Sequence, residues 1–308
     1  MGKSLILQAY CVAALLAFAV VGISTIVFAD TSTTSVLVGN ATPTVTNVSI
    51  GPASITLTEN ATTAVHISAT ITDTNGCGDV ITSGTVRGIL FREGVSSTCA
   101  ASELSCYRDV IMIASTSDTC AGGADTTVDA YGTANVYYFA DATDASSSFA
   151  TQSWFLSVKA IDDSDASSTA TDTTSHELNT LVALNVSSTI THGTVAPGSN
   201  TGATNQNATT SNTGNNTIDL DISASDMTGP GNPIVSTNQK YGTTNTTYAD
   251  LPFTATSSPP AQRAWNIGRT TASTSASVSS TFWGIAIPSG QASGTYTGTN
   301  TFTALWST

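Results

Sequence analysis

Apolar and polar residues alternate with a period of two along much of the chain. The clearest apolar positions of this kind are Val65, Ile67, Ala69 and Ile71; Trp154, Leu156, Val158 and Ala160; Ile218, Leu220 and Ile222; and Tyr296, Phe302, Ala304 and Trp306. Successive side chains of a β-strand point to opposite faces of its sheet, so this pattern predicts strands with one buried face. No stretch beyond residue 30 shows the 3.6-residue period of an amphipathic helix. The chain is therefore predicted to be all-β.

The predicted strands are short and are separated by Gly, Asn, Asp and Pro, which favour turns. In the first half we expect strands at 63–72, 80–92, 106–115, 131–140 and 153–161. Such spacing is typical of antiparallel β-sandwiches, in which each strand reverses the direction of the one before it. Alternate loops should therefore gather at the same end of the sandwich.

A chain of 308 residues is long enough for two domains. Residues 30–44 are rich in Ser, Thr, Gly and Pro and are expected to form a tether. Residues 166–175 contain no large apolar side chain, which predicts a linker between a first sandwich at 45–165 and a second at 176–308. The expected fold is thus two tandem antiparallel, immunoglobulin-like β-sandwiches.

The N-terminus resembles an export signal. Lys3 precedes an apolar run from Leu5 to Ala29, and Val27-Phe28-Ala29 before Asp30 has the small-x-small pattern of a signal-peptidase site. We expect residues 1–29 to be a signal peptide cleaved after Ala29. The alternative is an uncleaved anchor, since the run is long enough to span a bilayer, and it would then be the only membrane contact. Both interpretations place the rest of the chain outside the cell or on its surface.

Four cysteines remain beyond the signal segment: Cys77, Cys99, Cys106 and Cys120. An even number of cysteines in an exported chain predicts two disulfides, and zinc is disfavoured because no Cys-x-x-Cys or nearby His occurs. The strand order places Cys77 and Cys120 at one end and Cys99 and Cys106 at the other. A strand of roughly eight residues separates the ends by over ~20 Å, whereas a disulfide needs Cα atoms within about 7 Å. We therefore predict the bonds Cys77–Cys120 and Cys99–Cys106.

The same strand order gathers acidic residues at one end of the first sandwich. The expected carboxylates are Asp73, Asp79, Asp118, Asp125, Asp162, Asp163 and Asp165. Carboxylates that lie this close repel one another unless they are solvated or bind cations. One interpretation is a calcium site that stiffens the connection to the second domain, with candidate ligands Asp73, Asn75, Asp79, Asp162, Asp163 and Asp165. The other is a solvated acidic surface beside an Asn-Gly turn, since the order and the bidentate Glu of an EF-hand are absent.

Charge and composition exclude several classes of function. The formal net charge is −13, with 8 basic and 21 acidic side chains, so nucleic acids and anionic membrane surfaces are not expected partners. His66, His176 and His192 lie far apart, and no nucleophile elbow or other catalytic motif is present. We therefore expect no enzyme, and calcium is the only candidate cofactor.

Several segments resemble known surface proteins. In the first half, the segments that resemble immunoglobulin-like surface domains of prokaryotes are 70–76, 139–144 and 154–162. In the second half, the segments similar to exported bacterial and archaeal sandwiches, including CARDB-type adhesion domains and wall-associated WxL domains, are 212–215, 287–290 and 294–298. The WxL signature itself is missing, and Trp283-Gly284-Ile285 comes nearest to it. The resemblance implies an immunoglobulin-like fold at a cell surface and says little about activity.

These observations favour an exported cell-surface protein with a structural or adhesive role and no catalytic activity. One alternative is a pair of carbohydrate-binding modules whose exposed aromatic residues stack on sugars, although Trp265, Trp283 and Trp306 are expected to anchor the core of the second domain. Another is a filament subunit assembled by strand exchange, with the donor strand in Thr34–Val48. The expected partner is accordingly a surface glycan, another surface protein or a second copy of the chain.

Overall fold

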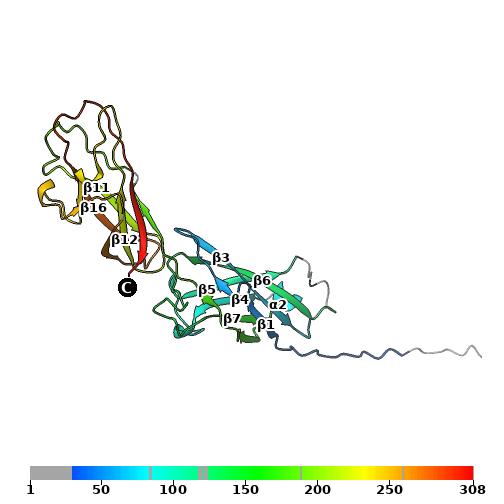
Figure 1. The fold of residues 1–308 in the computed structure, drawn as a ribbon. Coiled ribbons are helices and arrows are strands. Elements are labelled where there is room, and N and C mark those ends of the chain that lie inside the picture. Colours follow the sequence, from blue (N-terminus) through cyan, green and yellow to red (C-terminus); the bar gives the residue numbers. More distant parts are fainter. Residues whose placement is uncertain are drawn as a thin grey trace, which may run out of the picture. The chain divides into compact units, whose positions relative to one another are not determined.

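The computed structural model describes residues 30–82, 85–116, 120, 124–187, 189–258 and 260–307. The predicted signal segment 1–29, with its cleavage site, lies outside these residues. The described chain is all-β, and its strands pair almost entirely in antiparallel fashion, as the alternating pattern predicted (Figure 1). Asn40–Thr308 forms one compact unit.

The first half of this unit contains one seven-stranded sheet. Its strands, in spatial order, are β1 (Thr44–Ile50), β3 (Thr62–Thr72), β6 (Thr127–Tyr137), β5 (Cys106–Ala114), β4 (Thr85–Arg92), β7 (Trp154–Ile161) and β8 (Ser167–Thr171). All neighbouring strands run antiparallel. β1 also contacts β7 and β8, so the sheet curls until its two edges approach each other. A short parallel pair, β2 (Ser54–Ile55) with β9 (Glu177–Leu178), lies outside this sheet.

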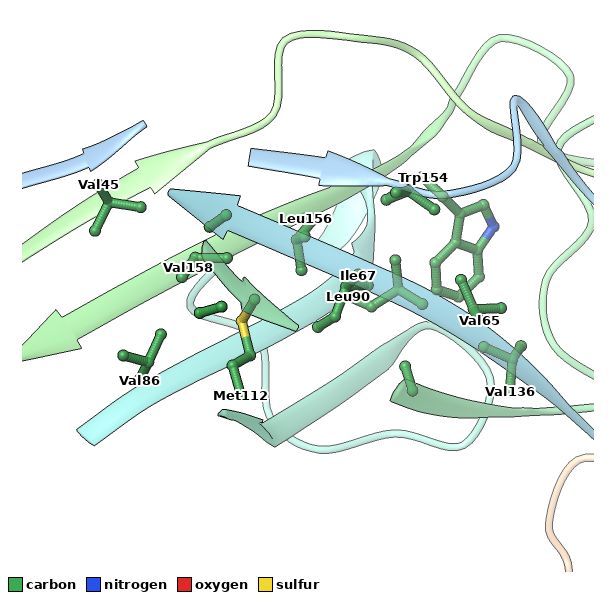
Figure 2. Close-up of a cluster of buried hydrophobic side chains, with 14 of the residues drawn as sticks. Val45, Val65, Ile67, Val86, Leu90, Met112, Val136, Trp154, Leu156 and Val158 are labelled. Carbon is green, nitrogen blue, oxygen red and sulfur yellow. The ribbon is translucent and has the colours of Figure 1, made fainter. Parts of the chain in front are cut away.

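The apolar faces of the curled sheet enclose the first core. Val65 and Ile67 of β3 are 1 % exposed, and Trp154, Leu156 and Val158 of β7 are fully buried. These side chains point toward one another between the strands (Figure 2). The indole N–H of Trp154 donates to the carbonyl oxygen of Asp141 at 3.0 Å, which satisfies the polar atom of this buried ring.

The second half contains two sheets that share another core. The five-stranded sheet has the order β10 (Leu184–Val186), β11 (Gln206–Asn212), β16 (Val278–Ile285), β13 (Gln239–Gly242) and β14 (Phe253–Thr254). The three-stranded sheet has the order β15 (Ala261–Ile267), β12 (Ile218–Ala224) and β17 (Asn300–Trp306). Apolar residues of both sheets meet in one cluster, in which the rings of Tyr241 and Trp283 stack with centroids 4.7 Å apart.

Three sequence-based expectations about these elements were wrong. The linker expected at 166–175 contains β8, which pairs with β7 through the backbone. An edge strand of small residues can pair in this way without contributing large side chains to the core. The strand expected at 80–92 begins with a single helical turn, α2 (Gly78–Ile81), before β4. The strand expected from 295 begins only at Asn300, in β17.

The tryptophans of the second half do not all lie in the core. Trp283 is fully buried, and Trp265 is partly buried against the core. Trp306 is 41 % exposed, so the expectation that it anchors the core was wrong. Among the described strands its own strand, β17, pairs only with β12, so Trp306 lies at an edge of the sheet.

Candidate functional site

The strand register brings several of the predicted acidic residues to one end of the first half. Thr72 at the end of β3 lies opposite both Thr44 and Thr127, and Ile161 at the end of β7 lies opposite Ser167. The loops that follow β3 and β7 therefore share this end, as the strand order predicted. Desolvation and the nearby carboxylates of Asp163, Asp73 and Asp162 raise the pKa of Asp79.

Two of the predicted calcium ligands hold the start of the compact unit instead. Asp162 accepts hydrogen bonds from the side chain of Asn40 at 2.9 Å and from the backbone N–H groups of Ser164 and Ala166. The hydrogen bond from Asn40 is the main cause that lowers the pKa of Asp162. Asn75 Oδ1 accepts a hydrogen bond from the N–H of Ala41 at 2.6 Å. These oxygens fix Asn40 and Ala41 at the acidic end.

The remaining predicted ligands do not form a metal centre in the part of the chain that the structure describes. Within it, no three His, Cys, Asp or Glu side chains are placed so that they could hold a metal ion. Asp73 is buried, with one carboxylate oxygen bound to the N–H of Asn75 and the other without a hydrogen-bond partner. Asp163 and Asp165 are exposed, and Asp118 lies outside the described residues. The predicted calcium site therefore stays a prediction without support from the geometry.

Both predicted disulfides are confirmed. The Cα atoms of Cys77 and Cys120 are 5.9 Å apart at the acidic end, and those of Cys99 and Cys106 are 6.2 Å apart at the other end. Cys77 precedes α2 and is fully buried, so the first bond attaches the loop before β6 to the core. Disulfides of this kind are typical of a non-reducing environment.

A buried ion-pair network connects the two halves. Asp141 accepts a hydrogen bond from Nε of Arg92 at 2.8 Å and pairs with Arg269 of the second half at 2.7 Å. Arg269 also donates to the carbonyl oxygen of Phe139, and the guanidinium of Arg92 lies over the ring of Phe149. The side chain of Asp141 is 4 % exposed, so its charge is neutralised by the two arginines rather than by water.

A tight turn of the second half, residues 212–215, forms the other part of this junction. The Asn215 side chain accepts from the N–H of Leu181 at 2.7 Å and donates to the carbonyl oxygen of Asn179 at 3.1 Å. Thr213 donates to the carboxylate of Glu59 at 2.9 Å. The turn is buried and binds both Glu59 of the first half and the connecting segment 179–183, so the segment 212–215 noted in the sequence acts as a docking element between the halves.

A large cavity of about 1170 Å³ opens in the second half, beside the strands β10 and β17. Its walls come from the end of β10, from the following segment 189–197, from residues 291–299 and from the start of β17. The apolar lining residues include Val186, Ile190, Ile285, Ile287 and Phe302. Residues 189–195 make no backbone hydrogen bond with any other residue that the structure describes, and Ile190 packs against the second core.

One edge of β17 forms backbone hydrogen bonds with β12, whereas its other edge forms none with any residue that the structure describes. The N–H of Ser307 donates to the carbonyl oxygen of Thr217, and the N–H of Ser225 donates to the carbonyl oxygen of Thr299. In an antiparallel pair these bonds recur at every second residue, so they show which residues of β17 direct their backbone groups toward β12. The other residues direct their backbone N–H and C=O groups away from β12, where no described residue binds them: Asn300, Phe302, Ala304 and Trp306. In β10, likewise, the alternate residues Leu184 and Val186 direct their backbone N–H and C=O groups away from β11, and no described residue binds these groups.

His192 lies in the wall of this cavity. Both of its ring nitrogens are buried, and neither has a hydrogen-bond partner in the described structure. Burial lowers the pKa of His192 to about 4, so the ring is neutral at physiological pH. By contrast, the buried His176 has two partners, with Nδ1 2.8 Å from the carbonyl oxygen of Pro52 and Nε2 3.1 Å from the carboxylate of Asp172.

An exposed apolar surface on β5 and β6 was not predicted from the sequence. Ile111 and Ile113 are 63 % and 65 % exposed, and Tyr131 beside them is 46 % exposed. Together with His66 and Thr133 they line a shallow hollow. The alternation along β5 contained the signal, since Ile111 and Ile113 have the opposite parity to the buried Met112.

No protein-family model matches the chain, and no curated protein matches it significantly. Among the residues that the structure describes, no helix has the length and apolar character needed to cross a membrane.

Proposed function

We propose that this protein is exported and serves a structural or adhesive role at the cell surface, without catalysis. The observation that carries the proposal is the pair of disulfides in a chain whose N-terminus resembles an export signal. The buried network around Asp141 supports a structural role, because it connects the two halves through one buried carboxylate that pairs with an arginine from each half.

We interpret the two apolar clusters as two tandem immunoglobulin-like sandwiches. The first cluster lies within residues 45–178 and the second within residues 208–283, and each is enclosed by its own strands. The resemblance of segments in both halves to prokaryotic surface domains supports this interpretation. The boundary then falls at 179–183, between β9 and β10, rather than at 166–175.

Surface labelling of the cells that produce the protein tests the proposed location. Intact cells are treated with an added protease and with a membrane-impermeant amine reagent, and a cytoplasmic protein serves as the control for lysis. We expect the chain to be cleaved and labelled, to begin at Asp30 and to contain no free thiol. A chain that is protected in intact cells, or whose four cysteines are reduced, would contradict the proposal.

Binding of a surface glycan is a second candidate function, favoured by the exposure of Tyr131 between two exposed isoleucines. Retention of the purified protein on polysaccharide columns tests it. If sugars bind here, Tyr131→Ala should abolish retention, whereas Tyr296→Phe, a change distant in sequence that keeps the aromatic ring, should not. Equal retention of both variants, or no retention of the native chain, would exclude this site as a glycan-binding site.

A further inference from the structure

We infer that the cavity beside β10 and β17 receives residues 30–39 of a second copy of this chain, which add a strand to the unpaired edge of β17. The inference rests on the proposed function, because the segment becomes a free N-terminus only after export and cleavage at Ala29. The inference identifies a second copy of the chain as the partner in the proposed structural role.

The donor segment is rich in Thr and Val, which favour β-strands, but it pairs with no strand in the described structure. Val36, Leu37 and Val38 are 86 %, 96 % and 74 % exposed, and residues 30–39 contain no helix or strand. Val36 and Val38 share one parity, so in an extended strand their side chains would point to the same side. Three consecutive exposed apolar residues are unfavourable in water and mark a segment that is covered by a partner. The donor is shorter than the Thr34–Val48 expected from the sequence, because residues from Thr44 onward already form β1.

The acceptor offers what such a strand needs. The unpaired backbone groups of β17 provide alternating donors and acceptors along its outer edge. The cavity next to that edge provides an apolar lining for one face of the added strand, from Val186, Ile190 and Phe302. Main-chain hydrogen bonds supply affinity and the apolar pocket supplies register, as in other cases of strand addition. The donor carries only Asp30 as a charged side chain, so its burial requires little desolvation of charge.

The compact unit begins at one of its ends, and the acceptor lies at the other. Asn40 is bound at the acidic end by Asp162, whereas the junction with the second half lies near Asn60, whose N–H donates to Thr213. The eleven-residue strand β3 separates those two ends by about 35 Å. Ser307, just after the end of β17, binds Thr217, which follows the junction turn 212–215. The end of β17 therefore lies near the junction, and the cavity lies at the start of β17, away from the junction. Contact between copies is then head-to-tail, which generates open chains unless the rotation closes a ring.

A binding experiment with a labelled peptide tests the inference directly. The probe is a fluorescent peptide of residues 30–39, and the acceptor is the purified chain that begins at Asn40 and so lacks its own donor. We expect saturable binding by fluorescence anisotropy. A peptide with Val36→Asp and Val38→Asp should bind at least tenfold more weakly. The matched control, with Thr33→Asp and Ser35→Asp, adds the same charge at positions of opposite parity and should bind within a few-fold of the native peptide.

Variants of the acceptor locate the bound peptide. Ile190→Asp places a charge in the cavity wall and should weaken binding at least tenfold, with folding checked by thermal unfolding. Ile113→Asp alters the exposed surface on β5 and should leave binding unchanged. The inference is overturned if the native peptide does not bind, if both double-substituted peptides bind alike, or if only Ile113→Asp weakens binding. None of these results would affect the proposed export, which surface labelling tests separately.

Discussion

Asp141 is the residue on which the connection between the halves depends most. Its carboxylate receives one arginine from each half, and the side chain of Arg92 is only 11 % exposed. Because this site is buried, water cannot take over the role of the carboxylate as the partner of the two arginines. The loss of its charge therefore leaves two guanidinium groups close together and partly buried. No local sequence pattern predicts this network, because Asp141, Arg92 and Arg269 lie far apart along the chain.

Replacement of Asp141 should therefore weaken the whole compact unit. We expect Asp141→Asn to lower the free energy of unfolding by about 3 kcal/mol, the lower end of the range for a broken buried ion pair, because Arg269 retains some exposure. Chemical denaturation measures the change. Asp163→Asn is the matched control, since it removes an exposed carboxylate beside other carboxylates and should cost nothing. A loss of stability equal in both variants would show that the network contributes no more than a surface charge.

His192 makes stability depend on pH in a defined direction. Its folded pKa of about 4 lies below the ordinary value of 6.5, so the unfolded chain binds more protons between these two pH values. Its contribution to stability is complete above about pH 6.5 and falls as the pH drops toward 4, by on the order of 2–3 kcal/mol. Thermal unfolding from pH 7.5 to 4.5 should therefore show a smaller decline for His192→Gln than for the native chain.

The comparison needs a histidine whose ring is exposed. His66 on β3 is such a residue, and His66→Gln should retain the native pH dependence. If His192→Gln and the native chain lose stability in parallel as the pH falls, the ring is not buried in the folded protein, and the described cavity wall is wrong.

At the scale of elements, the two disulfides should contribute unequally. The Cys77–Cys120 bond spans a sequence separation of 43 and the Cys99–Cys106 bond one of 7. In the chain-entropy model the longer loop stabilises the fold by about 4 kcal/mol and the shorter by about 2.5 kcal/mol. Replacement of both cysteines of a pair by Ser should thus lower Tm more for Cys77 and Cys120 than for Cys99 and Cys106. The reverse order in calorimetry would contradict the expectation.

The docking turn at 212–215 should tolerate no side chain at Gly214. A Cβ atom at this position would meet the carbonyl oxygen of Leu181 and lie 3.0 Å from the N–H nitrogen of Ala183, both of them backbone atoms. We expect Gly214→Ala to lower the free energy of unfolding by about 2–3 kcal/mol through displacement of the turn. Gly78→Ala in α2 is the control, because no atom lies within 4 Å of its added Cβ. Equal stability of the two variants by chemical denaturation would show that the turn is not packed as described.

Sequence patterns predicted those elements whose cause is local. The alternation at Val65 to Ile71 and at Trp154 to Ala160 identified β3 and β7, and the reversal of successive strands was enough to pair the cysteines and to bring the Asp73 and Asp162 loops together. The pattern could not show that Asp162 and Asn75 would bind Asn40 and Ala41, because that depends on where the chain enters the sheet. It also missed β8, whose small side chains carry no apolar signal.

In the assembly that we propose, the whole molecule supplies a strand at one end and lacks one at the other. The unpaired edge of β17 and the cavity beside it were invisible in the sequence, since Leu184, Val186 and Ile190 alternate as in any buried strand. An open sheet edge next to a cavity that is lined in part by apolar side chains is a liability for an exported protein unless something covers it. The exposed residues Val36 to Val38 are the apolar segment of the chain that can do so in another copy.

Size measurement of the purified chain that begins at Asp30 tests whether residues 30–39 join one copy to the next. Light scattering after gel filtration, together with negative-stain imaging, should show multimers that grow with protein concentration, while the chain that begins at Asn40 stays monomeric at the same concentrations. A chain from Asp30 that remains monomeric at high micromolar concentration, or multimers that persist when residues 30–39 are removed, would contradict the proposed assembly.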